Sequence, residues 1–454
     1  PILHEFKADN IHNIVNHSGA RLLFAGDVIW ESLDEKEMPQ LEGIILMTDF
    51  TLLVCRSKQL EYAREHLNEL FGRKFPRNFR REHVSYRRDE TEELAVINYT
   101  SGTTSASKGV MIPYRALWSN TQFAFEVLPL KPGDRVVSML PMAHMYGLAF
   151  EFLYEVACGC HVYFLTRMPS PKIIFQAFAE VKPHIVIAVP LIIEKIIKKN
   201  VLPKLETLKM KILLKVPIIN DKIKATVREH MIQGFGGNFH EIIIGGAAFN
   251  QEVEQLLKSI DFPYTVGYGM TECAPIISYE DWKRFKPGSC GKSAPRMEVR
   301  IDSPDPENIV GEILTRGDNV MLGYYKNPEA TAQVIDKDGW LHTGDLGVMD
   351  AAGNITIKGR SKNMLLGPSG QNIYPEEIED KLANMPLVAE NIVIQQADHK
   401  LTALVYPDFE EAYAQGMTDA DIAQVMENNR IALNQELPGY SQITRITIQP
   451  KEFE

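Results

Sequence analysis

The segment that decides the fold of this chain reads, in order, Tyr99-Thr100-Ser101-Gly102-Thr103-Thr104-Ser105-Ala106-Ser107-Lys108-Gly109. It directly follows residues 94–98, whose apolar and β-branched side chains predict a strand. Small and hydroxyl-bearing residues let backbone N–H groups approach phosphate oxygens, and Lys108 adds a cation. The pattern indicates a phosphate-binding loop, with a flexible Ser/Thr turn as the structural alternative.

This loop differs from the common nucleotide-binding and catalytic motifs. A Walker-type loop needs Ser or Thr after its Lys, whereas Lys108 is followed by Gly109. Residues 234–236 and 267–269 begin as G-x-G but lack the third Gly of a dinucleotide fingerprint. The chain contains no G-x-S-x-G and no H-E-x-x-H motif. These observations argue against the usual oxidoreductase and hydrolase classes.

Outward from the loop, strand candidates alternate with helical stretches, which is the α/β pattern. The further candidates are residues 135–140, 160–165, 185–189, 241–244 and 264–267. Open α/β sheets bind ligands beyond the carboxyl ends of their strands. We therefore expect the small-residue loops 100–104, 245–248 and 269–272 to converge on one site.

From about residue 311 the pattern changes to short antiparallel strands with tight turns. A polar junction at residues 359–362 precedes a smaller α+β pattern, with a helix at 375–384 and strands at 391–395 and 402–406. The sequence therefore predicts an α/β protein with two domains. Residues 1–359 would form a large domain of layered α/β sheets with a β-rich subdomain, and residues 360–454 a smaller, mobile α+β domain.

The composition favours small-molecule chemistry. A net charge of −11 argues against a nucleic-acid partner. The five cysteines form no C-x-x-C pair, the apolar runs are too short to span a bilayer, and the start at Pro1 lacks signal-peptide features. We expect a cytoplasmic protein.

Four motifs in order carry a resemblance to a known family. The segment 99–109, Tyr268-Gly269-Met270-Thr271-Glu272, His342-Thr343-Gly344-Asp345 and Lys358-Gly359-Arg360-Ser361-Lys362 resemble those of the adenylate-forming superfamily. Its members include acyl-CoA synthetases, peptide-synthetase adenylation domains and firefly luciferase. The similarity extends from about residue 17 to the end of the chain. It implies activation of a carboxylic acid by ATP, followed by transfer to a thiol.

The resemblance also implies roles for individual residues. The 100–108 loop would cradle the β- and γ-phosphates, and Thr100 and Glu272 would hold Mg²⁺. Asp345 would accept the ribose hydroxyls, with Arg360 beside the ribose and Tyr268 near the adenine. The implied ATP and AMP contacts are Thr100, Ser101, Gly102, Thr103, Thr104, Lys108, Gly246, Ala247, Ala248, Tyr268, Gly269, Met270, Thr271, Asp345 and Arg360. The implied catalytic set is Lys108, His144, Thr271 and Glu272.

Three positions keep alternatives open. His144, within residues 141–147, matches the family histidine beside the substrate carboxylate, although a lone His among apolar residues is usually a satisfied core residue. The loop 245–248 would admit the base and the acyl group, or serve tight packing, or both. By the resemblance, Lys362 would occupy the hinge position about which the small domain swings, a position where many relatives carry Asp.

The sequence also departs from the family pattern. Ser105 and Ser107 replace the usual Gly and Pro of the phosphate loop, which leaves the N–H donors available. The chain ends at Glu454 before the family's C-terminal Lys-bearing turn. We therefore expect both termini of the family's full length to be missing from this chain.

Residues 338–345 and 371–379 look most like those of bacterial long-chain fatty acid–CoA ligases. The expected function is therefore an ATP- and Mg²⁺-dependent fatty acid–CoA ligase with CoA as co-substrate. The alternatives are a ligase for a small or aromatic acid, delivery of the acyl group to a carrier protein, and a non-catalytic nucleotide- and acyl-binding module. Ten basic against four acidic residues in 191–230 suggest peripheral contact with the inner face of a membrane, or a solvated helical face.

Overall fold

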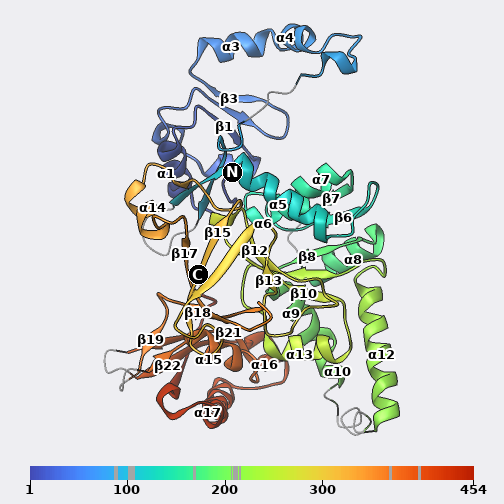
Figure 1. The fold of residues 1–454 in the computed structure, drawn as a ribbon, viewed down its shortest axis with the longest axis vertical. Helices are drawn as coiled ribbons and strands as arrows, with labels where there is room; N and C mark the ends of the chain where they lie inside the picture. The colour runs from blue at the N-terminus through green and yellow to red at the C-terminus, as the bar shows by residue number, and fades with distance from the viewer. Residues whose placement is uncertain are drawn as a thin grey trace.

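A computed structural model describes residues 1–85, 90–100, 108–166, 170–205, 207, 213, 216–367, 371–396 and 400–453. From top to bottom in Figure 1, an N-terminal part, a large central body and a smaller C-terminal body follow one another. No helix in these ranges is long and apolar enough to cross a bilayer.

A parallel sheet of five strands lies in the central body, in the order β7-β6-β8-β9-β10. A bridge between Val136 and Ile185 joins the pair β6–β7 to the other three strands. The strands are β6 (Arg135–Ser138), β7 (His161–Phe164), β8 (Val186–Ala188), β9 (Ile242–Ile244) and β10 (Tyr264–Val266). They match the predicted alternating pattern, and the α/β fold class is confirmed.

Helices cover both faces of this sheet at its centre, which explains why β8 and β9 are fully buried and entirely apolar. Ile242 and Ile244 of β9 pack in one hydrophobic core, and Ile243 packs in another on the opposite face. The first core receives side chains from α8 (Pro171–Val181), α9 (Pro190–Asn200), α12 (Pro217–Gly234) and α13 (Gln251–Ser259). The second receives side chains from α5 (Tyr114–Val127), the π-helical turn Ala149–Leu153 and α7 (Tyr154–Cys158).

The predicted strand at residues 94–98 belongs to a different sheet. β4 (Leu94–Thr100) pairs antiparallel with β5 (Lys108–Pro113), which pairs in turn with β16 (Gly323–Tyr324). The chain returns beside β4 directly after the phosphate loop, so β4 cannot join the parallel sheet through a crossover helix. The 94–98 strand therefore lies outside the parallel sheet that carries the other two loops.

The predicted β-rich part is present in the second half of the central body. β14 (Met297–Asp302), β15 (Gly311–Gly317), β17 (Leu341–Met349) and β18 (Ile355–Arg360) form a four-stranded antiparallel sheet. A smaller antiparallel sheet contains β11 (Tyr268–Gly269), β12 (Ile276–Tyr279) and β13 (Lys292–Ser293). These sheets carry the residues from Tyr268 to Arg360 that the motifs single out.

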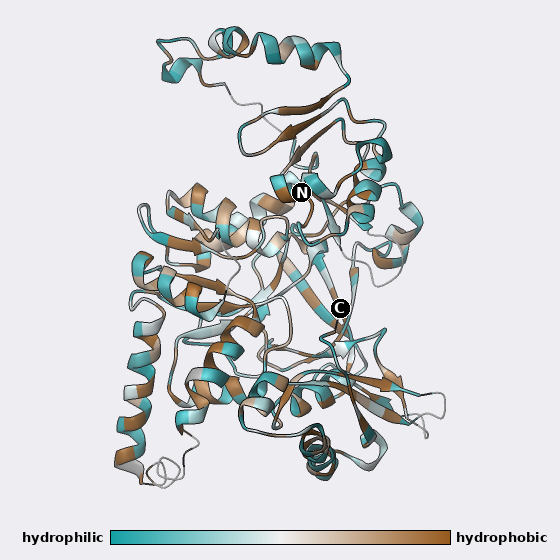
Figure 2. Ribbon diagram, turned by 180° about the vertical axis from the view of Figure 1, so that it is seen from behind, coloured by the Kyte–Doolittle hydropathy of each residue, from teal (hydrophilic) through white to brown (hydrophobic). Residues whose placement is uncertain are grey.

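The N-terminal part has a small core of its own. β1 (Leu22–Ala25), β2 (Gly43–Leu46) and β3 (Leu52–Cys55) form its sheet, against which α1 (Ala8–Ser18) packs through Ile11 and Val15. α3 (Lys58–Glu65) and α4 (Leu67–Lys74) extend from this sheet at the top of Figure 1. In Figure 2 the strands here are largely brown, whereas α12 alternates between brown and teal.

The C-terminal body also has a separate core. β21 (Val388–Gln395), β22 (Leu401–Pro407) and β23 (Ile443–Ile448) form its sheet, covered by α15 (Pro375–Leu382) and α17 (Asp419–Glu436). All of its core side chains lie between Leu365 and Ile448. β18 still pairs with β17 through Arg360 and Asp345, so the last strand of the central sheet extends one residue past the proposed boundary at 359/360.

Candidate active site

Loops at the carboxyl edge of the parallel sheet surround one cleft. The loop after β6 carries His144, the loop after β9 contains Gly245 and Gly246, and the chain after β10 continues through Gly267 to Thr271. Together with apolar residues of the second core they enclose about 570 Å³, counting space open to solvent. The lining residues are Phe123, Leu128, His144, Tyr146, Phe150, Ile187, Ile243, Gly245, Gly246, Gly267, Tyr268, Gly269, Met270, Thr271, Pro275, Ile276 and Tyr279.

Asp345, Tyr268 and Arg360 meet at one side of this cleft. The Tyr268 hydroxyl donates to Asp345 Oδ2 at 2.6 Å, and Arg360 Nε lies 2.9 Å from Asp345 Oδ1. Burial raises the pKa of Asp345, while the Arg360 charge and the Tyr268 hydrogen bond oppose that shift. The Arg360 side chain is 60% exposed, so its guanidinium remains accessible to a ligand. The structure thus joins three residues that are separated in sequence.

The backbone before Asp345 is held by β15. Glu312 accepts a hydrogen bond from Gly344 N at 2.9 Å, and Thr343 Oγ1 donates to the carbonyl of Ile313 at 2.7 Å. Gly344 has φ 72°, a left-handed conformation that favours glycine. The motif is therefore a bulge in the β15–β17 pairing, which explains why it places Asp345 so rigidly.

Glu272 and Lys108 meet through a residue that the sequence analysis missed. The Tyr324 hydroxyl donates to Glu272 Oε1 at 2.8 Å, and Lys108 Nζ lies 4.5 Å from the centre of the Tyr324 ring. Tyr324 reaches this place because β16 pairs with β5, where Tyr324 lies opposite Val110. Thr100 pairs with Lys108 across β4 and β5. In the sequence, Tyr324 is marked only by its position after Gly323, and a Gly followed by an aromatic residue is too common a pattern to indicate a site.

His144 lies at the mouth of the cleft. It caps α6 (Met145–Leu148), and its Nδ1 accepts the backbone N–H of Tyr146 at 3.3 Å. Desolvation lowers the pKa of His144, so the ring is neutral near pH 7. With Nδ1 accepting, the proton of the neutral ring lies on Nε2. His144 lines the cleft and does not lie in the core.

Close packing explains two glycines of the loops. A Cβ on Gly269 would lie 2.3 Å from the carbonyl oxygen of Pro275, and one on Gly245 would lie 3.3 Å from the Tyr146 ring. Gly246 lines the cleft with φ 93°, and Ala247 and Ala248 are exposed beside it. Both readings of the 245–248 loop, tight packing and open access, are compatible with this geometry.

Several predicted positions lie elsewhere or outside the description. Ser101, Gly102, Thr103 and Thr104 fall outside the described residues. Lys362 is exposed in the turn that follows β18. Met270 and Thr271 line the cleft.

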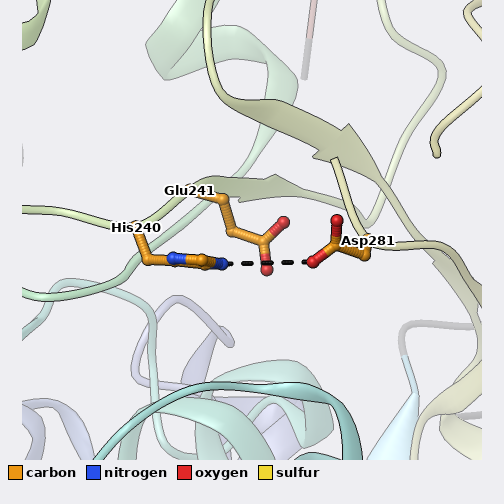
Figure 3. A group of neighbouring side chains, drawn as sticks. All are labelled: His240, Glu241 and Asp281. Atoms are coloured by element: carbon orange, nitrogen blue, oxygen red, sulfur yellow. Dashed lines mark ion pairs between the residues drawn. The ribbon is translucent and has the colours of Figure 1, made fainter. Parts of the chain in front are cut away.

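A buried carboxylate lies behind one wall of the cleft. The hydroxyl of Tyr279, which lines the cleft, donates to Glu241 Oε1 at 2.6 Å, and Trp282 N donates to Glu241 Oε2 at 3.3 Å. Burial raises the pKa of Glu241 to about 7. Figure 3 shows His240 and Asp281 beside it, with ligand atoms of all three within 4.8 Å of one another. This group has the residue types of a cation site, but both Glu241 oxygens already accept hydrogen bonds.

Comparison with known proteins identifies the family to which this chain belongs. The profile of the AMP-binding enzyme family matches residues 1–325. The chain belongs to this family. This AMP-binding enzyme is 27% identical to the probable acyl-activating enzyme 16 of Arabidopsis thaliana, over 85% of this chain and 61% of that protein. It is 29% identical to 4-coumarate–CoA ligase 5 of Oryza sativa subsp. japonica, over 74% of this chain and 60% of that protein.

A bacterial relative is the long-chain-fatty-acid–CoA ligase of Escherichia coli O157:H7. It is 31% identical over 66% of this chain and 49% of its own length. The chain thus spans between about half and about three fifths of the length of these three relatives. The resemblance to the adenylate-forming superfamily is confirmed.

Solved structures share the fold. The anthranilate–CoA ligase AuaEII in complex with anthranoyl-AMP matches 99% of this AMP-binding enzyme with a TM-score of 0.75 at 20% identity, over 79% of that chain. ATP-bound MatB from Rhodopseudomonas palustris matches 99% with a TM-score of 0.73 at 19% identity, also over 79% of that chain.

Proposed function

We propose that this AMP-binding enzyme activates a carboxylic acid with an apolar tail as an acyl-adenylate and transfers the acyl group to CoA. The observation that carries the proposal is the composition of the cleft. Its lining residues include the neutral His144 ring but no Asp, Glu, Lys or Arg. One end meets Asp345, Tyr268 and Arg360, and Tyr279 forms part of the apolar remainder. A polar nucleotide and an apolar acyl chain could therefore bind end to end.

ATP would bind along the edge formed by these loops. Asp345 supplies carboxylate oxygens for the ribose hydroxyls, and Arg360 lies beside it at 2.9 Å. The 100–108 loop and Thr271 would contact the phosphates. Gly245 and Gly246, which have no side chains, would let the base and the acyl group approach the backbone.

Mg²⁺ fits the residues at the phosphate end. Glu272 uses Oε1 for Tyr324, and within the described part of the chain its other oxygen carries no hydrogen bond. The Thr100 hydroxyl at the end of β4 adds a second oxygen donor, and oxygen is the ligand that Mg²⁺ prefers. When bound, Mg²⁺ would neutralise negative charge on the phosphates.

His144 would orient the acid. Its Nε2–H can donate to the substrate carboxylate, whose other oxygen attacks the α-phosphorus while pyrophosphate leaves. In the second step a CoA thiolate attacks the acyl carbonyl, and AMP leaves. The proposed hinge at Lys362 lets the small domain, residues 360–454, present different surfaces in the two steps.

A fatty acid is the proposed substrate, and an aromatic acid is the alternative. Phe123, Tyr146, Phe150 and Tyr279 in the lining favour either an alkyl chain or a ring. The E. coli relative is named for long-chain fatty acids, and the rice relative for 4-coumarate. We further propose a cytoplasmic location, with the basic residues of 191–230 contacting anionic lipid at the inner face of the membrane.

The test is pyrophosphate release with butyrate through palmitate, benzoate and 4-coumarate, each with and without CoA. For a fatty acid substrate, affinity should rise by about 0.8 kcal/mol, roughly fourfold, per buried methylene until the cleft is full. Glu272→Gln should abolish the release. ATP binding without release for any acid would favour the non-catalytic module, and a preference for the ring acids would favour the aromatic alternative.

A further inference from the structure

Glu151 is a fully buried carboxylate next to the candidate active site. It lies in the π-helical turn Ala149–Leu153 and is 0% exposed. Its Oε2 accepts hydrogen bonds from Leu140 N at 2.8 Å, Met139 N at 3.0 Å and Ser138 Oγ at 3.1 Å. One oxygen atom therefore holds three consecutive residues.

These three residues lead directly to His144. Ser138 is the last residue of β6, and Met139 and Leu140 begin the loop that ends at His144. The far end of this loop is held separately, because Asn98 Nδ2 donates to the carbonyl of Ala143 at 2.7 Å. Glu151 therefore determines where the loop leaves the sheet, and β4 determines where it arrives.

The π-helical turn orients Glu151 toward residues 138–140. π-helical turns are rare and often occur at functional sites. Here the turn places Phe150 in the lining of the cleft, while Glu151 faces the loop. Desolvation raises the pKa of Glu151 to about 8 in spite of its three hydrogen bonds. Burying a carboxylate is unfavourable, but an apolar side chain at this position would leave the Met139 and Leu140 N–H groups and the Ser138 hydroxyl without this acceptor.

Glu155, one helical turn later, is the natural comparison. It is also 0% exposed, and desolvation likewise raises its pKa to about 8. Neither of its carboxylate oxygens has a hydrogen-bond partner in the described part of the chain. The two glutamates thus lie on the same continuous helical stretch and are equally buried, but only Glu151 contacts the loop that leads to His144.

We propose that Glu151 is a positioning residue that acts through this loop and keeps the His144 ring at the mouth of the cleft, facing the carboxylate of the acid. The inference rests on the proposed function, since it assigns the acid to the His144 side of the cleft. In the proposed function ATP would be held by other elements, among them Asp345 on β17 and Glu272 after β11. Loss of Glu151 should therefore affect the acid more than ATP.

The kinetic test compares Glu151→Leu and Glu151→Gln with Glu155→Leu and Glu155→Gln. Glu151→Leu should reduce kcat/KM for the acid by about 10- to 100-fold, the cost of misplacing a reacting group by about 1 Å, with KM for ATP within about twofold. Glu151→Gln keeps an acceptor oxygen and should recover most of the loss. Both Glu155 variants should stay within about twofold of the wild type. Equal losses in Glu151→Leu and Glu155→Leu, or a parallel rise in both KM values, would overturn the proposal.

A second measurement does not depend on activity. Hydrogen exchange of the full chain should accelerate at Met139 and Leu140 in Glu151→Leu but not in Glu155→Leu. If Glu151→Leu does not fold, Ser138→Ala removes one of the three donors and should lower kcat/KM for the acid by a smaller factor in the same direction. Unchanged exchange at 139 and 140 would refute the positioning role. If the wild type shows slow hydrogen exchange at residues 139 and 140 but releases no pyrophosphate with any acid, the proposed function would be refuted instead.

Discussion

At the scale of single residues, Tyr324 connects two groups of opposite charge. Its hydroxyl is 2.8 Å from Glu272 Oε1, and its ring lies under Lys108 Nζ at 4.5 Å. A hydrogen bond to a carboxylate orients the group and contributes more than a neutral one. The Tyr324 side chain thus contacts both groups, and we propose that it orients them toward the phosphates.

Replacing Tyr324 by Phe tests this role. The ring contact with Lys108 remains, but Glu272 loses its hydrogen bond, worth about 1.5–3 kcal/mol. We expect the Mg²⁺ concentration for half-maximal pyrophosphate release to rise by roughly tenfold, with KM for the acid unchanged. The measurement is a Mg²⁺ titration at saturating ATP. A titration curve identical to that of the wild type would show that Tyr324 does not orient Glu272.

Glu155 gives a pH dependence of stability at the same scale. Burial raises its pKa from the ordinary 4.5 to about 8 in the folded protein. The folded state therefore binds the proton more tightly than the unfolded state, and stability falls as pH rises between these values. Glu155→Gln has no titrating carboxyl at this position, so the fall in stability with rising pH should disappear.

We expect Glu155→Gln to stabilise the protein by about 1–3 kcal/mol at pH 8 and by much less at pH 5. Urea unfolding at the two pH values measures the difference. Glu42, whose pKa is lowered by its hydrogen bond with exposed Arg21, provides a surface control without this trend. An equal effect of Glu155→Gln at both pH values would contradict the expected titration.

At the scale of elements, the site depends on how tightly β11 and β12 approach. Tyr268 and Gly269 of β11 pair with Ser278 and Ile276 of β12, with an irregularity between them. Gly269 allows this because its missing Cβ would lie 2.3 Å from the carbonyl oxygen of Pro275. The close approach places the Tyr268 hydroxyl against Asp345.

Gly269→Ala should push the two strands apart and lower the free energy of unfolding by about 1–3 kcal/mol. Because Tyr268 would move, we also expect a higher KM for ATP. Gly267→Ala is the matched control, since its Cβ would meet no atom closer than 3.5 Å. Similar stabilities for the two variants, measured by urea unfolding, would show that β11 has room to adjust.

At the scale of the whole molecule, the central and C-terminal bodies have separate cores joined by polar contacts, among them the Lys358–Glu377 ion pair at 3.0 Å. Lys198 Nζ donates to the carbonyl of Ala383 at 3.0 Å, and Asn250 Nδ2 donates to Asn384 Oδ1 at 2.7 Å. The ion pair of exposed Arg360 with buried Asp345 lies within the central sheet, between β18 and β17, and does not cross this interface. Such an interface permits the proposed movement of residues 360–454.

We expect two transitions in urea, because bodies with separate cores need not unfold together. All four tryptophans, Trp30, Trp118, Trp282 and Trp340, precede residue 360, so their fluorescence reports on the rest of the molecule. Circular dichroism reports on both bodies and should begin to change at a lower urea concentration than the fluorescence does. Asn384→Ala should lower the free energy of the first unfolding transition by roughly 1 kcal/mol. The urea midpoint of that transition should fall accordingly, and the fluorescence midpoint should not change. Coincident curves would show a single cooperative unit.

The sequence by itself determined the local features of this protein. The alternating β-rich and helical stretches predicted the α/β class, and the antiparallel pattern with its turns predicted the β-rich part. The motifs around Lys108, Glu272, Asp345 and Arg360 resembled those of the superfamily before any contact between them was known. Each of these signals lies within a few consecutive residues, where backbone preferences and side-chain chemistry act directly.

Tertiary structure alone decided the contacts between distant segments. β4 lies in its own antiparallel sheet because of strand pairing, which residues 94–98 cannot specify. Tyr324 reaches Glu272 across 52 positions because β16 pairs with β5. Glu151 reaches the His144 loop because a π-helical turn faces the end of β6. These contacts depend on packing, register and burial, which arise only when the whole chain has folded, so a linear pattern carries no signal for them.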